Sequence, residues 1–251
     1  RRGNPVASLT GVSALVTGAT GFLGSHLTAR LLDEGATVHA LTSAVSAEYP
    51  RRLLAERDRI TLHEGSLTDR SAMDRVAEKA RPDLVFHLGA YSHVGKSWQR
   101  IDECVQVNVQ GTVNLLQALE RHGVQRFIYG GTSDVYGDVG VPYREEGHVN
   151  PLSPYAVSKY AAERYCRMFH DCQGWPVVMV RPCNAYGPGQ SADRIIPEVV
   201  VRALRHQPLP MTLGEQTREF TYATDVAAGF VAAALRACRA EAVWMDPREI
   251  L

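Results

Sequence analysis

The sequence predicts an α/β fold, in which helices cover both faces of a doubly wound parallel sheet and a smaller C-terminal lobe follows. Three observations lead to this prediction. Apolar, β-branched runs alternate with segments of helical periodicity between residues 11 and 181. A glycine-rich turn joins the first apolar run to the first helical segment. Beyond residue 181 this rhythm is broken by prolines at 182, 188, 197, 208 and 210.

The first predicted element is a buried strand over 13–17, with the sequence SALVT. Leu23, Leu27 and Leu31 recur at four-residue steps and predict a helix, and Gly35 stands where a helix C-cap belongs. Similar apolar runs predict further strands over 37–41, 60–63, 83–87, 126–129 and 177–180. Helices are predicted between them over 70–80, 105–116 and 155–169.

Two more helices are predicted beyond the sixth strand, over 195–205 and 224–239. We divide the chain into a domain over 11–181 and a mainly ligand-covering lobe over 182–251. The lobe is expected to be incomplete, with the 224–239 helix packing back on the first domain. Ligands in parallel sheets bind beyond the carboxyl ends of the strands, which is where most motifs described below fall.

The composition is typical of a globular protein, with 45% hydrophobic and 22% charged residues. Basic and acidic residues number 27 each, so no global charge favours binding to nucleic acid or to an acidic membrane. Five cysteines without a CxxC pair argue against a disulfide framework and against a metal site. We find no membrane-spanning apolar run and no signal sequence, so a cytoplasmic location is expected.

The turn after the first strand reads GATGFLG. Gly18 lets the chain turn sharply, Gly21 lets the backbone approach a pyrophosphate, and Gly24 lets helix and sheet pack closely. The N-terminus of the following helix offers free N–H groups and a positive dipole end to phosphates. This strand–turn–helix context predicts a dinucleotide-binding domain of Rossmann type over 11–181.

The second predicted strand ends in Thr42, where an NAD-binding domain is expected to carry an acid for the adenosine ribose. Arg51 and Arg52 follow, and they are equally well explained as contacts to the 2′-phosphate of NADP or as a solvated charged face. This part of the sequence therefore leaves the choice between NAD and NADP open.

Tyr155 and Lys159 stand one helical turn apart on the same helix face. A phenol with a pKa of about 10 is a poor base at neutral pH. A neighbouring ammonium stabilises the phenolate, so we expect Lys159 to lower the pKa of Tyr155. Tyr155 would then take a proton from a sugar hydroxyl as hydride leaves for a nicotinamide.

Polar residues follow the fifth strand at the same edge of the predicted sheet, in the sequence GGTSDVYG. Thr132 is placed to donate a hydrogen bond to the reacting oxygen, and Asp134 adds a carboxylate. The alternative is a polar loop that Asp134 caps.

The motifs GATGFLG, TSDVYG, SPYAVSK and RPCNAYGPGQ, in this order and at these separations, resemble the extended short-chain dehydrogenase/reductase family. More narrowly, they resemble its nucleotide-sugar epimerase/dehydratase branch, over residues 11 to 237. The resemblance implies a nicotinamide cofactor, NAD or NADP, a nucleoside-diphosphate sugar as substrate, and an enzyme that oxidises C4 of that sugar.

The resemblance also implies roles for individual residues. The implied catalytic residues are Thr132, Asp134, Tyr155 and Lys159. The implied cofactor-binding residues are Gly18, Gly21, Phe22, Leu23, Gly24, Thr42, Leu67, Leu88, Gly89, Ala90, Asn108, Tyr155, Lys159 and Pro182. The implied substrate contacts are Thr132, Asn184 and Arg218, the last because a guanidinium binds phosphate oxygens in a bidentate manner.

The sequence departs from the family at three places. The acid expected near Thr42 is missing, and Ser66 stands where relatives often carry an aspartate near the adenine. After Cys238 the sequence no longer resembles the family. The helices over 104–119 and 155–169 match the pair that forms a dimer contact in the family, so a homodimer is expected.

The order of Thr132, Ser133 and Asp134 resembles the pattern of GDP-mannose 4,6-dehydratases and UDP-glucuronate decarboxylases, which usually place Glu at the third position. The reaction that we favour from this resemblance is a sugar-nucleotide 4,6-dehydration, in which an extra base removes the C5 proton so that water leaves from C6. The alternatives are a 4-epimerase, then a decarboxylase similar to those acting on UDP-glucuronate. A dinucleotide-sensing binding protein is disfavoured because Tyr155 and Lys159 are both present. We interpret His87 as a packed or hydrogen-bonded core histidine, and Cys183 as a core-like cysteine.

Overall fold

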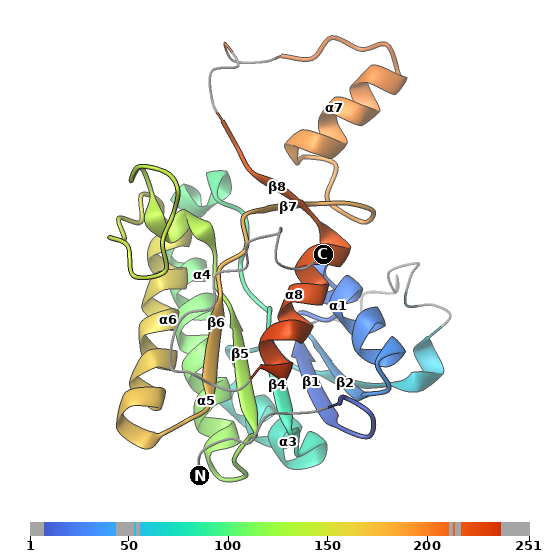
Figure 1. Cartoon of the computed structure of the whole chain (residues 1–251), viewed down its shortest axis with the longest axis vertical. Helices are drawn as coiled ribbons and strands as arrows, with labels where there is room; N and C mark the ends of the chain where they lie inside the picture. The colour runs from blue at the N-terminus through green and yellow to red at the C-terminus, as the bar shows by residue number, and fades with distance from the viewer. Residues whose placement is uncertain (1–7, 44–52, 54–55, 211–212, 214–216, 237–251) are drawn as a thin grey trace.

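The computed structural model describes residues 8–43, 53, 56–210, 213 and 217–236. Six strands form a parallel sheet in the order β3-β2-β1-β4-β5-β6 (Figure 1). The strands are β1 (Ser13–Thr17), β2 (Thr37–Thr42), β3 (Ile60–Glu64), β4 (Leu84–His87), β5 (Arg126–Gly130) and β6 (Val177–Val180). The predicted parallel α/β sheet is therefore confirmed, with strand ends within one residue of those predicted.

Helices cover both faces of this sheet. One face is covered by α1 (Phe22–Asp33) and α8 (Ala223–Leu235). The other face is covered by α3 (Arg70–Ala80), α5 (Gly111–Glu120) and α6 (Pro154–Gln173). Shorter helical turns connect these elements: η1 (Arg57–Arg59), η2 (Gly95–Gln99), α4 (Ile101–Cys104), η3 (Val105–Gln110) and η4 (Ser133–Tyr136).

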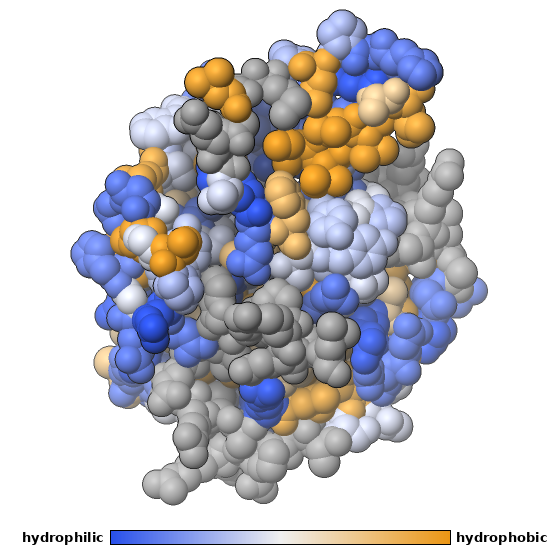
Figure 2. All heavy atoms as spheres, turned by 45° about the horizontal axis from the view of Figure 1, so that its top comes forward, coloured by the Kyte–Doolittle hydropathy of each residue, from blue (hydrophilic) through white to orange (hydrophobic). Residues whose placement is uncertain are grey.

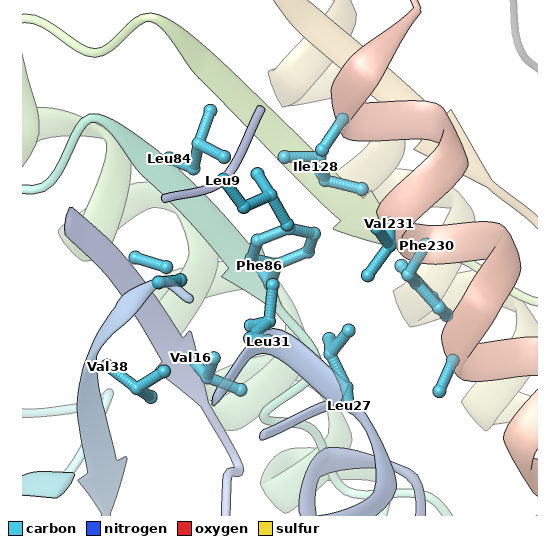
Figure 3. Packing of buried hydrophobic residues seen from close by; sticks show 14 of the residues in the cluster. Leu9, Val16, Leu27, Leu31, Val38, Leu84, Phe86, Ile128, Phe230 and Val231 are labelled. Carbon is cyan, nitrogen blue, oxygen red and sulfur yellow. The ribbon is translucent and has the colours of Figure 1, made fainter. Parts of the chain in front are cut away.

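Successive residues of each strand point to opposite faces, which produces two hydrophobic cores. On the α1/α8 side, Phe86 of β4 packs among Leu31 of α1, Ile128 of β5 and Phe230 of α8 (Figure 3). Each fully buried side chain of this size contributes about 1.5–3 kcal/mol relative to exposure. Because α8 follows residue 182 yet belongs to this core, the end of the described chain is attached to the sheet.

The helix predicted over 105–116 is not one continuous α-helix. The chain there forms α4, then the π-helix η3, and then α5. The side chain of Thr112 donates to the carbonyl of Asn108 at 2.6 Å, and the wider π turn directs the Asn108 side chain into the interior. Valine spacing alone does not distinguish a π turn from an α-helix, and π turns occur often at functional sites.

A second, two-stranded parallel sheet lies beyond the carboxyl ends of the main sheet (Figure 1). It pairs β7 (Asn184–Tyr186) with β8 (Phe220–Tyr222), neither of which was predicted. Between them α7 (Ile195–Leu204) extends away from the main sheet and buries none of its residues. Figure 2 shows a broad apolar region at this end of the molecule, where Ile195, Val200 and Leu204 are exposed.

The predicted 224–239 helix ends earlier than expected. Its described part begins at Ala223 and ends at Leu235, because Arg236 takes an extended backbone conformation. The predictions about Arg51, Arg52, Cys238 and 241–251 concern residues outside those that the structure describes. Among the residues that the structure describes, no helix combines the length and the apolar character needed to cross a membrane.

Candidate active site

A cavity of about 620 Å³ opens at the carboxyl edge of the main sheet. The glycine turn forms one wall, and the segment after β4 forms another. The end of β5 and the start of α6 supply the polar residues. The sequence-predicted residues that line it are Gly18, Gly21, Phe22, Leu23, Gly24, Leu88, Gly89, Ala90, Thr132, Asp134, Tyr155, Lys159, Pro182 and Asn184.

The glycine turn leaves no room for side chains. Gly18 has a φ of +67°, and a Cβ there would lie 2.9 Å from the backbone N of Gly89. A Cβ on Gly24 would lie 2.0 Å from the carbonyl oxygen of Gly18, so α1 packs directly against the turn. Both positions require glycine for steric reasons, and the backbone itself faces the cavity.

The N-terminus of α1 is open toward this cavity. No side chain caps it at Gly21, and its first turn carries no acidic residue. The free N–H groups and the dipole of a 12-residue helix therefore favour an anion at this place. An open helix end and a turn without side chains fit the pyrophosphate of a dinucleotide.

Tyr155 and Lys159 of α6 both line the cavity, but their electrostatics differ from the prediction. The pKa of Tyr155 is raised to about 12, mainly by burial and also by the charge of Asp134, against the lowering effects of the Thr132 hydroxyl and the Arg194 charge. The expectation that Lys159 lowers the pKa of Tyr155 is thus wrong for the protein without ligands.

Lys159 is nearly fully buried, which explains why its pKa is lowered. Burial lowers the pKa of Lys159 to about 8, against the opposing effect of Cys166 and Glu163. Its Nζ lies 4.4 Å from the centroid of the Tyr129 ring, an arrangement in which the aromatic face attracts the ammonium. The hydroxyl of Tyr129 in turn donates to the Lys159 carbonyl at 2.9 Å.

Asp134 lies close to Tyr155 in the turn η4. The side chain of Thr132 caps this turn by accepting from the Asp134 N–H at 3.2 Å. Burial raises the pKa of Asp134, while the Thr132 hydroxyl and the charges of Arg218 and Arg194 lower it. A carboxyl group that is disposed to hold a proton next to a phenol is suited to acid–base chemistry.

A second cavity, of about 1180 Å³, adjoins the first and shares Asp134, Cys183 and Asn184 with it. Arg218 lines this second cavity, so the predicted substrate residues Asn184 and Arg218 are brought together here. Burial raises the pKa of the Cys183 thiol to about 11, which fits the interpretation of Cys183 as a residue without nucleophilic function.

A strap formed by residues 187–194 connects β7 to α7 and lies along the first cavity. On one side His26 of α1 donates from Nε2 to the Pro188 carbonyl at 3.1 Å. On the other side Asp193 lies 3.1 Å from His93 Nε2 and 3.2 Å from Lys96 Nζ. The strap is therefore tied to both walls of the cavity.

Gln190 of the strap has one side-chain amide atom that is hydrogen-bonded and one that is not. Its Nε2 donates to the Ala185 carbonyl at 2.7 Å, but its Oε1 is buried and has no hydrogen-bond partner among the described residues. Gln190 also lines the cavity, so its Nε2 hydrogen bond ties the strap to β7 at the cavity wall.

A buried ion pair supports the loop that carries Thr132. The Arg181 guanidinium binds Glu163 of α6, with Nε at 2.9 Å from Oε2, and both side chains are more than nine-tenths buried. Arg181 also donates to the Tyr136 hydroxyl at 2.7 Å. Removing one partner of such a pair leaves an uncompensated buried charge, which costs about 3–5 kcal/mol.

Three residues predicted to bind the cofactor do not line the cavity. Thr42 is buried at the end of β2, with its Oγ1 3.2 Å from Thr20 Oγ1. Leu67 is buried beneath Gly89, where a Cβ would lie 3.0 Å from Leu67 Cδ1. Asn108 is also buried, and it supports the cavity wall from behind.

Sequence reasoning missed Arg194, Asp193 and the pair formed by Glu163 and Arg181. Arg194 directly precedes α7 and lines the cavity. Its charge lowers the pKa of both Asp134 and Tyr155. Its only signal in the sequence is its place directly before the Ile-Ile-Pro run. Among the residues that the structure describes, no group of three His, Cys, Asp or Glu residues is arranged to hold a metal ion.

A family model described as the NAD dependent epimerase/dehydratase family matches residues 14–243. Among curated proteins, a dTDP-glucose 4,6-dehydratase of Neisseria meningitidis is 34% identical over 228 residues, which cover 84% of this chain. The chain spans 64% of the length of that relative. A protein of Bacillus subtilis named an uncharacterised UDP-glucose epimerase is 32% identical, over 87% of this chain and 71% of its own length.

Solved structures of a dehydratase and of an epimerase are both similar to this chain. The dTDP-glucose 4,6-dehydratase of Streptomyces venezuelae with NAD bound superposes with a TM-score of 0.83 and 31% identity, covering 94% of this chain and 78% of its own. The UDP-glucose 4-epimerase of Thermotoga maritima with UDP-glucose superposes with a TM-score of 0.80 and 31% identity, covering 87% of this chain and 72% of its own.

Proposed function

The chain belongs to the NAD-dependent epimerase/dehydratase family, and from this premise we propose that it oxidises C4 of a nucleoside-diphosphate hexose to a 4-keto intermediate. We further propose that the overall reaction is a 4,6-dehydration. One observation supports this most strongly: Tyr155, Lys159, Thr132 and Asp134 line the same cavity as the glycine turn.

NAD is the proposed cofactor, held at its pyrophosphate by the glycine turn and the N-terminus of α1. Leu88, Gly89 and Ala90 form the facing wall. When bound, NAD⁺ supplies a hydride acceptor and a positive charge beside the phenol. Positive charge near Tyr155 opposes the effects of burial and of Asp134 on its pKa.

Tyr155 is the proposed base that takes the proton of the C4 hydroxyl. Thr132 is proposed to orient the reacting oxygen, because it lines the same cavity and its hydroxyl interacts with both Tyr155 and Asp134. We assign Lys159 an electrostatic role on the phenolate. Substrate phosphates are assigned to Asn184 and Arg218, which the proposed substrate lobe over 182–251 contributes to the second cavity.

Asp134 favours dehydration over epimerisation. A 4-epimerase needs no further base, because the sugar only turns over and takes the hydride back on its other face. A dehydratase needs a group that removes the C5 proton while water leaves from C6, and Asp134 is a carboxyl that lines the cavity and whose charge acts on Tyr155. The 4-epimerase remains the second candidate, supported by the similarity to the Thermotoga enzyme.

The reaction is tested by incubating the protein and NAD with UDP-, GDP-, dTDP- and CDP-hexoses and hexuronates, followed by mass measurement of each sugar nucleotide. Loss of one water supports the dehydratase. An unchanged mass with a new isomer supports the epimerase instead, and loss of carbon dioxide supports a decarboxylase. If none of the sugar nucleotides changes, the proposed function is refuted.

The role of Asp134 is tested with Asp134→Asn on whichever sugar nucleotide loses water. The amide keeps the size of the side chain but cannot accept the C5 proton, so water loss should slow by about 100-fold. Oxidation of C4, followed by the near-ultraviolet absorbance of reduced nicotinamide, should persist. Equal losses in both steps would show that Asp134 does not act on C5.

We also propose that the chain forms a homodimer through α4, η3 and α6. Ile101, Val105, Val157 and Met168 leave between 42% and 52% of their surface exposed there. Met168→Glu should shift the protein to a monomer in sedimentation velocity, whereas Leu204→Glu on the exposed face of α7 should not. A monomeric unmodified protein would refute the proposal.

A further inference from the structure

His87 ends β4 directly before the residues that line the cavity, yet it points away from the cavity into the second core. Its ring lies between two threonine hydroxyls. Nδ1 is 2.7 Å from Thr17 Oγ1, and Nε2 is 2.9 Å from Thr112 Oγ1. All three residues are at most 1% exposed, so every polar atom of this group must find its partner within the protein.

The two threonines determine which ring nitrogen carries the proton. Thr17 Oγ1 accepts from the Gly89 N–H at 2.9 Å, so its own hydrogen is free to point at His87 Nδ1. Thr112 uses its hydrogen on the Asn108 carbonyl at 2.6 Å, so its oxygen accepts from His87 Nε2. Both ends require the same neutral ring, with the proton on Nε2.

The connection continues from Asn108 to the catalytic helix. Asn108 Oδ1 accepts from the Tyr91 N–H at 2.7 Å, and its Nδ2 donates to the Tyr91 carbonyl at 3.1 Å and to Ser158 Oγ at 2.9 Å. Ser158 then donates to the carbonyl of Tyr155 at 2.8 Å. One buried network therefore joins the cavity wall at Gly89 and Tyr91 to the first turn of α6.

We infer that His87, as the neutral ring protonated on Nε2, is a positioning residue that fixes the cavity wall over Leu88 to Tyr91 relative to Tyr155. This inference deepens the proposed function and depends on it for its effect on turnover. Without the ring, the Gly89 turn loses its connection to η3 through Thr17 and Thr112, and only the hydrogen bonds of Asn108 to Tyr91 still hold the wall to η3. A displacement of about 1 Å between reacting groups reduces rates by about 100-fold.

The charge environment agrees with a neutral ring. Burial lowers the pKa of His87 to about 3, and the charge of Lys159 contributes in the same direction. An imidazolium would place a second donor against Thr17 and a second positive charge near Lys159. The surrounding rings of Phe127 and Tyr129 offer it no hydrogen-bond acceptor in compensation.

The first test measures the ring and its neighbours directly, in the protein without ligands. Nitrogen NMR of ¹⁵N-histidine-labelled protein at neutral pH should show His87 with a proton on Nε2 and none on Nδ1. Amide hydrogen exchange at Gly89 and Tyr91 should accelerate by about tenfold or more in His87→Phe, which keeps a ring but forms neither hydrogen bond. A proton on Nδ1, or unchanged exchange, would overturn the inference.

The second test separates positioning from stability. His87→Phe should lower kcat by about 100-fold and weaken NAD binding by about tenfold, whereas His87→Gln, which keeps a donor near Nε2, should recover much of both. The matched control is Phe86→Leu, on the same strand but in the opposite core. It should lower Tm while leaving kcat and the Kd for NAD within about twofold of the parent values.

The outcomes of the two tests are distinguishable. If His87→Phe behaves like Phe86→Leu in kcat and Kd, then His87 is only structural and the inference fails while the proposed function stands. If the parent protein neither binds NAD nor changes any sugar nucleotide, the proposed function fails. The NMR and exchange measurements then still decide whether His87 links the cavity wall to α6. Should His87→Phe not fold, Thr112→Val removes one link of the same network at nearly constant volume.

Discussion

Tyr155→Phe is expected to reduce turnover of the responsive sugar nucleotide by about 10³- to 10⁴-fold, because it removes the hydroxyl that is proposed to take the C4 proton. The ring is retained, so the packing of α6 should not change. Tyr155 lines the cavity beside Asp134 and Thr132. The measurement is kcat with saturating NAD and substrate, together with the Kd of NAD, which should change little.

Tyr165→Phe is the matched control, since Tyr165 lies on the same helix but is 42% exposed on its outer side. This variant should keep the parent kcat. If Tyr155→Phe turns over substrate as fast as the parent protein, the assignment of the catalytic base is wrong. In that case Asp134, whose charge acts on Tyr155 in the same cavity, becomes the candidate base.

Gly24→Ala is expected to abolish detectable NAD binding. The added Cβ would lie 2.0 Å from the Gly18 carbonyl oxygen and 2.7 Å from its carbon, both of which are backbone atoms that cannot rotate away. Helix α1 must then move off the turn, which displaces the N–H groups proposed to hold the pyrophosphate. Titration with NAD, followed by calorimetry, measures the loss.

Gly140→Ala provides the comparison, because no atom lies within 4 Å of its added Cβ. It should bind NAD as the parent protein does. Thermal unfolding of both variants distinguishes a damaged site from an unfolded chain. Unchanged NAD affinity in a folded Gly24→Ala protein would refute the assignment of the glycine turn as the pyrophosphate site.

The sheet and the glycine turn were predictable because their signals are local. Apolar β-branched runs such as SALVT favour buried strands wherever they occur, and a turn with glycines at 18, 21 and 24 has few other uses between a strand and a helix. The spacing of Tyr155 and Lys159 likewise determines a shared helix face. These predictions needed no knowledge of what the elements pack against.

The predictions failed where packing decides the outcome. The valine spacing over 105–116 indicated a continuous helix, whereas the interior hydrogen bonds of Asn108 accompany a π turn. The strap was also invisible in the sequence, because Asp193 meets His93 across 100 residues of chain. His87 was interpreted as a core histidine, and only its two threonine partners identify the form of the ring.

By itself the sequence determined the six strands of the main sheet, the turn that needs glycine, and the candidate side chains for proton transfer. Backbone conformation and helix spacing depend on near neighbours, so they can be read from the chain. Only the tertiary structure decided that Tyr155 has a raised pKa and that Lys159 lies over Tyr129. Burial and charge depend on groups brought together from distant segments, and no local pattern contains that information.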